Sequence, residues 1–370
     1  MKLPNFLGLM LWIAIPLQLF AQQPSTDWRV GVSKADITPT QSVRLSGYGN
    51  RSKPTLEVDD RLSARALAFQ FRDQQVSLIV SIDAIGLSAT LTDRISAQIT
   101  QQFSVARNQL VLCTTHSHTA PHLEDVLTNL LSTPLSEPER LNMMAYSQSL
   151  VDSVVRIAGE AIGRMRPATM EFGTGRADFA VNRRLLKENK WTGFGVTADG
   201  PVDRTVRVLR ARETNGQTLA IVYQYACHCT SISPDLNRIS ADWAGLSASK
   251  IEQAIRPTSP NCIALPIIGC GADANPNPRN TYQNAMDHAS EMATAVQTVC
   301  SGTLQPLPPL VSQSFELVAL APERPSRDRL KTMTESNSVV ERNFANSMLE
   351  TLKRKGRLPE TYPAPVHVWN

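Results

Sequence analysis

Three of the six histidines lie within seven positions, directly after a predicted strand over residues 109–113. Side chains of an extended chain alternate between two faces, so His116 and His118 are expected to point to the same face. Two imidazoles at the end of a strand share a metal ion, or one binds the metal while the other transfers protons. This metal site is favoured over the alternative, a polar loop with solvated histidines. His122 follows Pro121 and is expected to be a bystander or to support the ligands.

A fourth histidine, His228, follows another predicted strand, over residues 218–225. A histidine that leaves an apolar strand needs partners for both ring nitrogens. By itself the pattern favours a structural histidine bonded to the backbone, but together with the first cluster it favours a metal ligand. Cys227 and Cys229 flank it, and in an oxidising compartment they are expected to form disulfides or to be buried thiols rather than metal ligands.

Three further segments have polar or glycine-rich sequences. Glycines in residues 269–279 allow the backbone to approach a ligand and to present amide groups to an oxyanion, although an ordinary turn would have the same composition. Arg183 offers a guanidinium group for a carboxylate or an oxyanion, the alternative being an ordinary surface arginine. Asp242 precedes a predicted helix and is expected to be its N-cap, with support of His228 as the less favoured role.

The elements that must position these residues are predicted from hydrophobic periodicity and turn residues. Strands alternate with helices along the chain, which predicts an α/β fold: a mixed β-sheet flanked by helices, with the active-site residues at strand ends. The predicted strands cover residues 28–39 (running into a turn), 64–71, 75–82, 109–113, 205–212, 218–225 and 262–268, and the predicted helices cover 90–103, 147–165, 240–255 and 285–299.

Composition and charge exclude several classes of protein. The 370 residues are 42% hydrophobic and 19% charged, so the chain can bury a substantial core. The net charge of +4 is scattered and forms no basic stripe with interleaved aromatics, which argues against nucleic-acid binding. The sequence also lacks the nucleophile elbow of serine hydrolases, the His-Glu-x-x-His motif of metalloproteases and the P-loop of nucleotide-binding proteins.

Both ends of the chain differ from its middle. Lys2, an apolar run over residues 6–20 and the polar residues after Ala21 predict a signal peptide over residues 1–21, because the run is shorter than the roughly 20 residues that span a bilayer. The remainder is therefore expected to be secreted or periplasmic. Residues 28–305 form the predicted α/β region, and residues 306–370 a helical and proline-rich extension that leads into a further C-terminal part.

Seven segments, in the same order along the chain, resemble the N-terminal catalytic region of the neutral/alkaline non-lysosomal ceramidase family. The resemblance implies a zinc enzyme that hydrolyses the amide bond of a lipid-like or N-acylated substrate. It also implies peripheral contact with a membrane surface, and it does not specify the oligomeric state. His116 and His228 would be the zinc ligands, His118 would transfer protons and Arg183 would bind the carbonyl oxygen. The seven segments are residues 30–39, 45–48, 115–121, 182–184, 200–203, 228–231 and 272–276.

The chain departs from the pattern of this family in two respects. The family carries a serine where this chain has Asn275, so the asparagine amide is expected to act as a catalytic donor to the oxyanion while water attacks. The family's other zinc ligands, a glutamate and a tyrosine, are expected beyond residue 370, because no matching glutamate motif precedes it. The alternative function is a non-catalytic or degenerate binding protein on the same fold, without a complete metal site.

Overall fold

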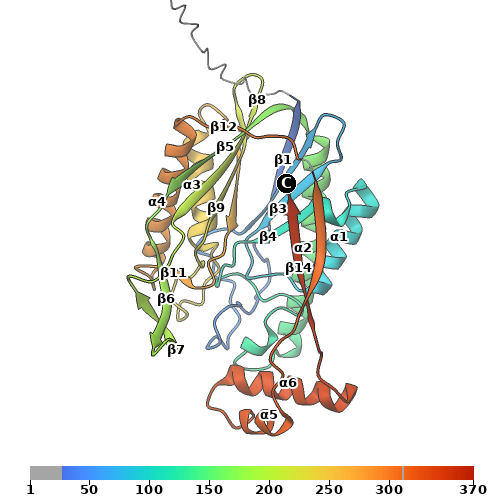
Figure 1. Ribbon diagram of the computed structural model, residues 1–370, viewed down its shortest axis with the longest axis vertical. Helices are drawn as coiled ribbons and strands as arrows, with labels where there is room; N and C mark the ends of the chain where they lie inside the picture. Colours follow the sequence, from blue (N-terminus) through green and yellow to red (C-terminus); the bar gives the residue numbers. More distant parts are fainter. Residues whose placement is uncertain (1–26, 311) are drawn as a thin grey trace, which may run out of the picture.

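The protein is described here from a computed structural model, which places residues 27–310 and 312–370. The predicted signal peptide over residues 1–21 lies outside these residues. Figure 1 shows the arrangement of the elements, with strands in the middle and helices on both sides.

The main sheet has nine strands in the order β10-β9-β8-β5-β1-β2-β3-β4, with β12 paired to β5. The pairs β3–β4 and β9–β10 are parallel and the other pairs are antiparallel, so the predicted mixed sheet is confirmed. The strands are β1 (Trp28–Asp36), β2 (Ser63–Phe71), β3 (Ser77–Ile82), β4 (Leu110–Thr114), β5 (Arg166–Arg176), β8 (Thr205–Glu213), β9 (Thr218–Tyr225), β10 (Ile263–Ile268) and β12 (Gln305–Pro306).

The sheet is bent so that its two ends meet. Strand β10 contacts β2, β3 and β4, and the hydroxyl of Ser81 on β3 donates to the carbonyl of Pro266 on β10 at 2.5 Å. An apolar core that includes Trp28, Phe69 and Val222 therefore lies between the two halves of the sheet. This folding back brings the ends of β4 and β9 to the same region of the molecule.

Four helices cover the outer faces of the bent sheet. Helices α1 (Ala89–Phe103) and α2 (Glu137–Gly163) lie on one side, and α3 (Asp242–Ile255) and α4 (Tyr282–Ser301) lie on the other (Figure 1). Each side has its own apolar core against the sheet, so the layers run helix, sheet, sheet, helix. Helix α2 begins at Glu137 rather than at the predicted residue 147, because Ser136 and Glu139 form a capping box ahead of the amphipathic part.

Several elements were not predicted from the sequence. Strand β5 was missed, as were the hairpin strands β6 (Ala180–Lys187) and β7 (Lys190–Thr197), which form a three-stranded sheet with β11 (Ala274–Pro276). The proline-rich end of the chain is strand β14 (Tyr362–Trp369), paired along its length with β13 (Gln313–Leu320). The charged helical region is two helices, α5 (Arg327–Met333) and α6 (Val339–Lys355).

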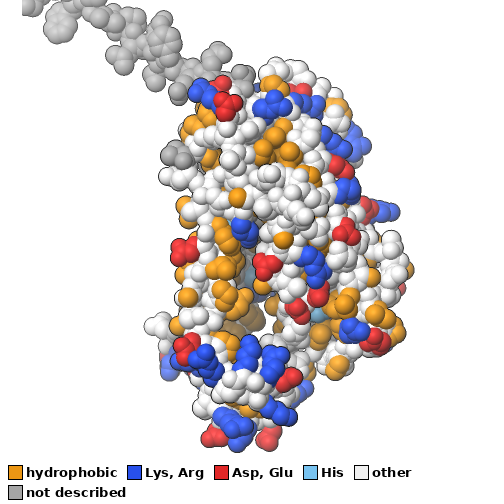
Figure 2. Space-filling view, turned by 90° about the vertical axis from the view of Figure 1, so that its right-hand side faces the viewer, with side chains coloured by type: hydrophobic (Ala, Val, Ile, Leu, Met, Phe, Trp, Pro, Cys, Tyr) orange, Lys and Arg blue, Asp and Glu red, His pale blue; other side chains and the backbone are white. Residues whose placement is uncertain are grey.

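The C-terminal segment packs against the main body at its upper end. The Trp369 ring lies 5.7 Å from that of Phe69, and its Nε1 donates to the carbonyl of Asn108 at 2.8 Å. At the other end, α5 and α6 form the lowest part of the molecule, where Lys and Arg side chains gather below a hollow (Figure 2). The predicted boundary between residues 28–305 and 306–370 stays a prediction.

Across the described part of the chain, every helix is too short or too polar to cross a bilayer.

Candidate functional site

Three imidazole rings converge where the ends of β4 and β9 meet. His116 and His118 lie in the loop after β4, and His228 lies in the loop after β9. One ring nitrogen from each lies within 4.8 Å of those of the other two. The ring centroid of His116 is 4.9 Å from that of His118 and 4.8 Å from that of His228. We call these three residues the histidine trio.

A short contact between the two loops holds the trio together. Ser117 and Cys229 form a parallel β-bridge outside the main sheet, and the amide of His118 donates to the carbonyl of Cys229 at 3.2 Å. The extended geometry expected around His116 does not persist, because its φ is 56°, in the left-handed region. Its ring therefore meets that of His118 through a local turn and not through strand alternation.

The ring nitrogens of the trio fall into two kinds. The Nδ1 of His116 donates to the carbonyl of Ile85 at 2.7 Å, and the Nδ1 of His228 donates to the carbonyl of Gly271 at 2.7 Å. Such bonds orient metal-binding histidines and leave Nε2 free to coordinate. Both ring nitrogens of His118 are buried without a hydrogen-bond partner among the described residues. Buried polar atoms rarely stay unpaired, so three imidazoles with this arrangement fit a metal ion.

Burial favours the neutral form of all three imidazoles. It lowers the pKa of His228 to about 4 and also lowers the pKa of His116, with the nearby charge of Arg183 acting in the same direction. The pKa of His118 lies well below its ordinary value, first because of burial and then because of the neighbouring imidazoles. Neutral imidazole is the form that binds metal ions, so the site is ready to bind one near neutral pH.

Arg183 and Asn275 lie beside the trio on two paired strands. Arg183 on β6 donates from Nε to the carbonyl of Ala272 at 3.0 Å and from Nη1 to Oδ1 of Asn275 on β11 at 3.3 Å. The hydroxyl of Thr230 donates to the same Oδ1 at 3.2 Å, so the amide NH₂ of Asn275 is the group left to donate. Because the amide of His228 donates to the carbonyl of Ala274, next to Asn275, at 3.0 Å, the structure brings all five predicted site residues together.

Three residues to which the sequence assigned no role of their own enclose His118. Gly47 has φ of 92°, and a Cβ atom there would lie 2.6 Å from Cγ of His118, so only glycine fits without displacing the ring. The Tyr48 ring lies 4.9 Å from that of His118, and Arg51 donates to the His118 carbonyl. Arg51 also donates to the carbonyls of Ser46, Pro234 and Leu236. The Leu45-Ser46-Gly47-Tyr48 motif was the sequence signal for this support.

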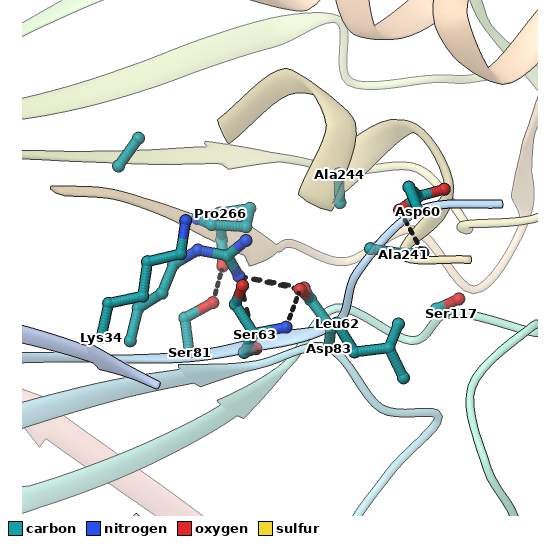
Figure 3. Close-up of polar contacts among 12 residues, drawn as sticks. Lys34, Asp60, Leu62, Ser63, Ser81, Asp83, Ser117, Ala241, Ala244 and Pro266 are labelled. Atoms are coloured by element: carbon teal, nitrogen blue, oxygen red, sulfur yellow. Dashed lines mark hydrogen bonds and ion pairs between the residues drawn. The ribbon is translucent and has the colours of Figure 1, made fainter. Parts of the chain in front are cut away.

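A polar network anchors the loop of the trio to the start of α3. The hydroxyls of Ser117 and Thr119 both donate to the carbonyl of Ser240, at 2.9 and 2.8 Å. Ser240 in turn donates to the carboxyl of Asp60. This carboxyl also accepts from the amide of Ala241 at 2.9 Å (Figure 3).

The buried ion pair of Arg65 and Asp83, 3.0 Å apart, forms a separate polar cluster. Asp83 also accepts from the amide of Ser63 at 2.8 Å (Figure 3), so its charge has both an ionic and a hydrogen-bonding partner. The pair joins β2 to the residue that follows β3 and includes none of the histidine rings.

The prediction that Asp242 is an N-cap is wrong. The cap position is Ala241, and Asp242 is the first residue of α3, where its carboxylate accepts from the amides of Trp243 at 2.6 Å and Ser231 at 2.9 Å. These bonds fix the loop that follows His228. The carboxylate does not orient the His228 ring, whose Nδ1 bonds to a carbonyl. Asp242 is therefore structural.

His122 and the cysteines lie outside the trio. His122 is buried next to Arg44, to whose carbonyl its amide donates at 2.7 Å. All six cysteines are free thiols, and Cys227 and Cys229 are buried, which raises the pKa of both thiols well above the ordinary value. Of the two outcomes expected for this pair, the structure has buried thiols.

Comparisons with known proteins agree with this arrangement. Residues 28–323 match the family described as neutral/alkaline non-lysosomal ceramidase, N-terminal. The neutral ceramidase of Pseudomonas aeruginosa is 24% identical over 243 residues, which are 64% of this chain and 35% of that protein.

Two solved structures have a similar fold. A ceramidase described as complexed with C2 superposes with a TM-score of 0.66 at 19% identity, over 79% of this chain and 46% of that one. The crystal structure of the neutral ceramidase from Pseudomonas aeruginosa superposes with a TM-score of 0.65 at 20% identity, over 80% of this chain and 48% of that one. The chain thus spans about a third of the length of the curated relative and about half of the solved chains.

Proposed function

This chain belongs to the neutral/alkaline non-lysosomal ceramidase family, and on that premise we propose that it acts in the zinc-dependent hydrolysis of an amide bond in a lipid-like N-acyl substrate. The observation that carries the proposal is the convergence of three neutral imidazoles with Arg183 and Asn275. The supporting relatives are neutral ceramidases, and one solved neighbour is described as complexed with C2.

His116 and His228 are proposed to hold the metal through Nε2, because the Nδ1 atom of each already donates to a carbonyl. When bound, zinc supplies a Lewis acid that polarises the amide and lowers the pKa of a water molecule to about 7. His118 has two ring nitrogens without a partner among the described residues, so it is the imidazole able to take up and release a proton.

Arg183 and Asn275 are proposed to bind the carbonyl oxygen of the substrate as negative charge develops on it. The guanidinium is held by the carbonyl of Ala272 and by Oδ1 of Asn275, which fixes its direction. With Oδ1 occupied, the amide NH₂ of Asn275 is the remaining donor. One such donor contributes about 10²–10³-fold in rate, so an asparagine in place of the family's serine supports electrostatic stabilisation and not nucleophilic attack.

A second candidate function is binding without catalysis. It is favoured by Asn275 and by the absence of any carboxylate from the metal-binding group found among the described residues. The two candidates share the fold and the histidine trio, so only turnover separates them. In either case we propose export from the cytoplasm, on the basis of the apolar segment within residues 1–21.

The test is hydrolysis of N-acyl lipids by the purified chain loaded with zinc. Activity lost in His118→Gln, lowered in Arg183→Lys and lowered about 10²–10³-fold in Asn275→Ala would support the hydrolase. Asn275→Ser, which introduces the family's residue, is the matched variant. Stoichiometric zinc without turnover, in wild type and in Asn275→Ser alike, would support the binding protein.

A further inference from the structure

The β6–β7 hairpin exposes large apolar side chains next to the functional site. Residues of these types are normally buried, and contiguous exposed apolar groups mark interaction surfaces. Leu186 is 61% exposed and Trp191 is 55% exposed. In Figure 1 the two strands project from the lower left flank of the body, next to β11. The exposed apolar side chains of the hairpin are those of Leu185, Leu186, Trp191, Phe194 and Val196.

The tip of the hairpin has a defined geometry. Glu188 and Asn189 have φ of 52° and 59°, as in the two-residue turn of type I′ that matches the twist of paired strands. The turn places Leu186 opposite Trp191 and Lys187 opposite Lys190. The apolar pair and the basic pair are therefore consecutive along a structured tip, with their side chains on opposite faces of the two strands.

The charge of the hairpin is suited to an anionic partner. Like charges directly opposite each other destabilise a strand pair, and neither Lys187 nor Lys190 forms an ion pair within the described residues. Over residues 183–199, Arg183, Arg184 and the two lysines outnumber the acidic residues Glu188 and Asp199. An anionic surface would relieve the repulsion at the tip.

We infer that the tip of the β6–β7 hairpin docks on an anionic lipid surface. Leu186 and Trp191 enter the interfacial region, where the amphipathic indole is favoured, and Lys187 and Lys190 bind the phosphates of the headgroups. The inference takes the lipid as partner from the proposed function, but docking is measured without turnover.

Docking at this tip would place the functional site at the lipid surface. The Arg183 guanidinium lies 4.6 Å from the centroid of the Phe194 ring on β7, and its Nη1 lies 3.3 Å from Oδ1 of Asn275. Strand β6 thus carries two residues of the docking tip, Leu186 and Lys187, together with the site residue Arg183.

The experiment is flotation of the full chain with vesicles of equal parts phosphatidylcholine and phosphatidylglycerol, compared with vesicles of phosphatidylcholine alone. The inference expects binding to the anionic vesicles that weakens as salt is added. Lys187→Gln with Lys190→Gln should weaken partitioning about 30-fold, and Leu186→Thr with Trp191→Thr about tenfold or more. The matched control is Leu141→Gln with Met144→Gln on α2, since these residues are 53% and 42% exposed.

Several results would overturn the inference. They are an absence of vesicle binding by the wild type, equal binding by the hairpin variants, or an equal loss in the α2 control. If the hairpin variants lose self-association, measured by sedimentation, and keep vesicle binding, the tip would be assigned to contact between copies of the chain. Unchanged thermal unfolding of the variants is the check on folding. Vesicle binding by a chain that shows no hydrolysis would support the docking tip while contradicting the proposed enzyme.

Discussion

Ser117 and Cys229 pair in a parallel β-bridge, and each of them is flanked by residues of the histidine trio. The bridge is a backbone contact between two loops that the sequence separates widely. It requires the ends of β4 and β9 to meet, which in turn requires the main sheet to fold back on itself. The metal-binding geometry therefore depends on the packing of the whole sheet.

The first prediction separates metal ligands from the proton-transfer residue. His116→Gln and His228→Gln should each lose zinc, because each removes an imidazole whose Nδ1 is already oriented by a carbonyl. His118→Gln should keep zinc and lose activity. Elemental analysis of dialysed protein is the measurement, and buried His122→Gln is the control that should keep the metal. Zinc loss in His118→Gln equal to that in His116→Gln would make His118 a ligand.

The second prediction concerns the glycine behind His118. Gly47→Ala should lower activity more than tenfold and destabilise the fold by about 1–2 kcal/mol, because a Cβ at positive φ is strained and would also contact the His118 ring. Urea unfolding and turnover are the measurements. Gly163→Ala, at the end of α2 where a Cβ meets nothing within 4 Å, should be neutral or slightly stabilising. Equal effects of the two changes would contradict the role of Gly47.

The third prediction concerns the buried arginine beneath the trio. Burial lowers the pKa of Arg51 to about 10, so holding its charge there is unfavourable, and hydrogen bonds to four carbonyls must offset that cost. Arg51→Met should lower the free energy of unfolding by about 2 kcal/mol and lower turnover about tenfold or more, since the His118 carbonyl loses its donor and the ring its fixed position.

The control for Arg51 is an exposed arginine in a surface ion pair. Arg140 pairs with Glu137 on the first turns of α2, and Arg140→Met should leave the free energy of unfolding close to that of the wild type. Chemical denaturation and turnover measure both variants. An Arg51→Met protein with wild-type turnover would show that the arginine stabilises the loops without positioning His118.

The fourth prediction is a pH dependence of stability through Asp60. Burial raises the pKa of this carboxyl from 3.8 to about 7, against the hydrogen bonds from Ser240 and Ala241. Between these values the folded state holds a proton that the unfolded state has lost. The stabilisation from this proton is complete below pH 3.8, the pKa of the unfolded state. It decreases by up to ~1.4 kcal/mol per pH unit as the pH rises, and it is lost at about pH 7.

The comparison variant for this effect is Asp60→Asn, which keeps an acceptor for the amide of Ala241 and does not titrate. The difference in unfolding free energy between wild type and this variant should change with pH from about 5 to about 7 and level off above. Urea denaturation at a series of pH values measures it. A difference that stays constant across this range would place the folded-state pKa of Asp60 near its ordinary value.

The sequence determined the elements whose patterns are local. The apolar strands on both sides of the main sheet and helix α1 followed from periodicity and turn residues, because neighbouring residues set these features. The motifs around His116, His118, His228, Arg183 and Asn275 resemble those of the ceramidase family, and this resemblance predicted that the five residues belong to one site. The hairpin β6–β7 was missed because Glu188-Asn189 lacks the glycine that usually marks such a turn.

Only the tertiary structure decided how these residues meet. Strand alternation predicted a common face for His116 and His118, whereas the rings converge through a left-handed residue and a bridge to Cys229. Gly47 and Arg51 carried no chemical signal of their own, because their importance lies in which ring and which carbonyl they face. Such contacts join segments far apart in the chain. They depend on the fold of the sheet, so no local pattern contains them.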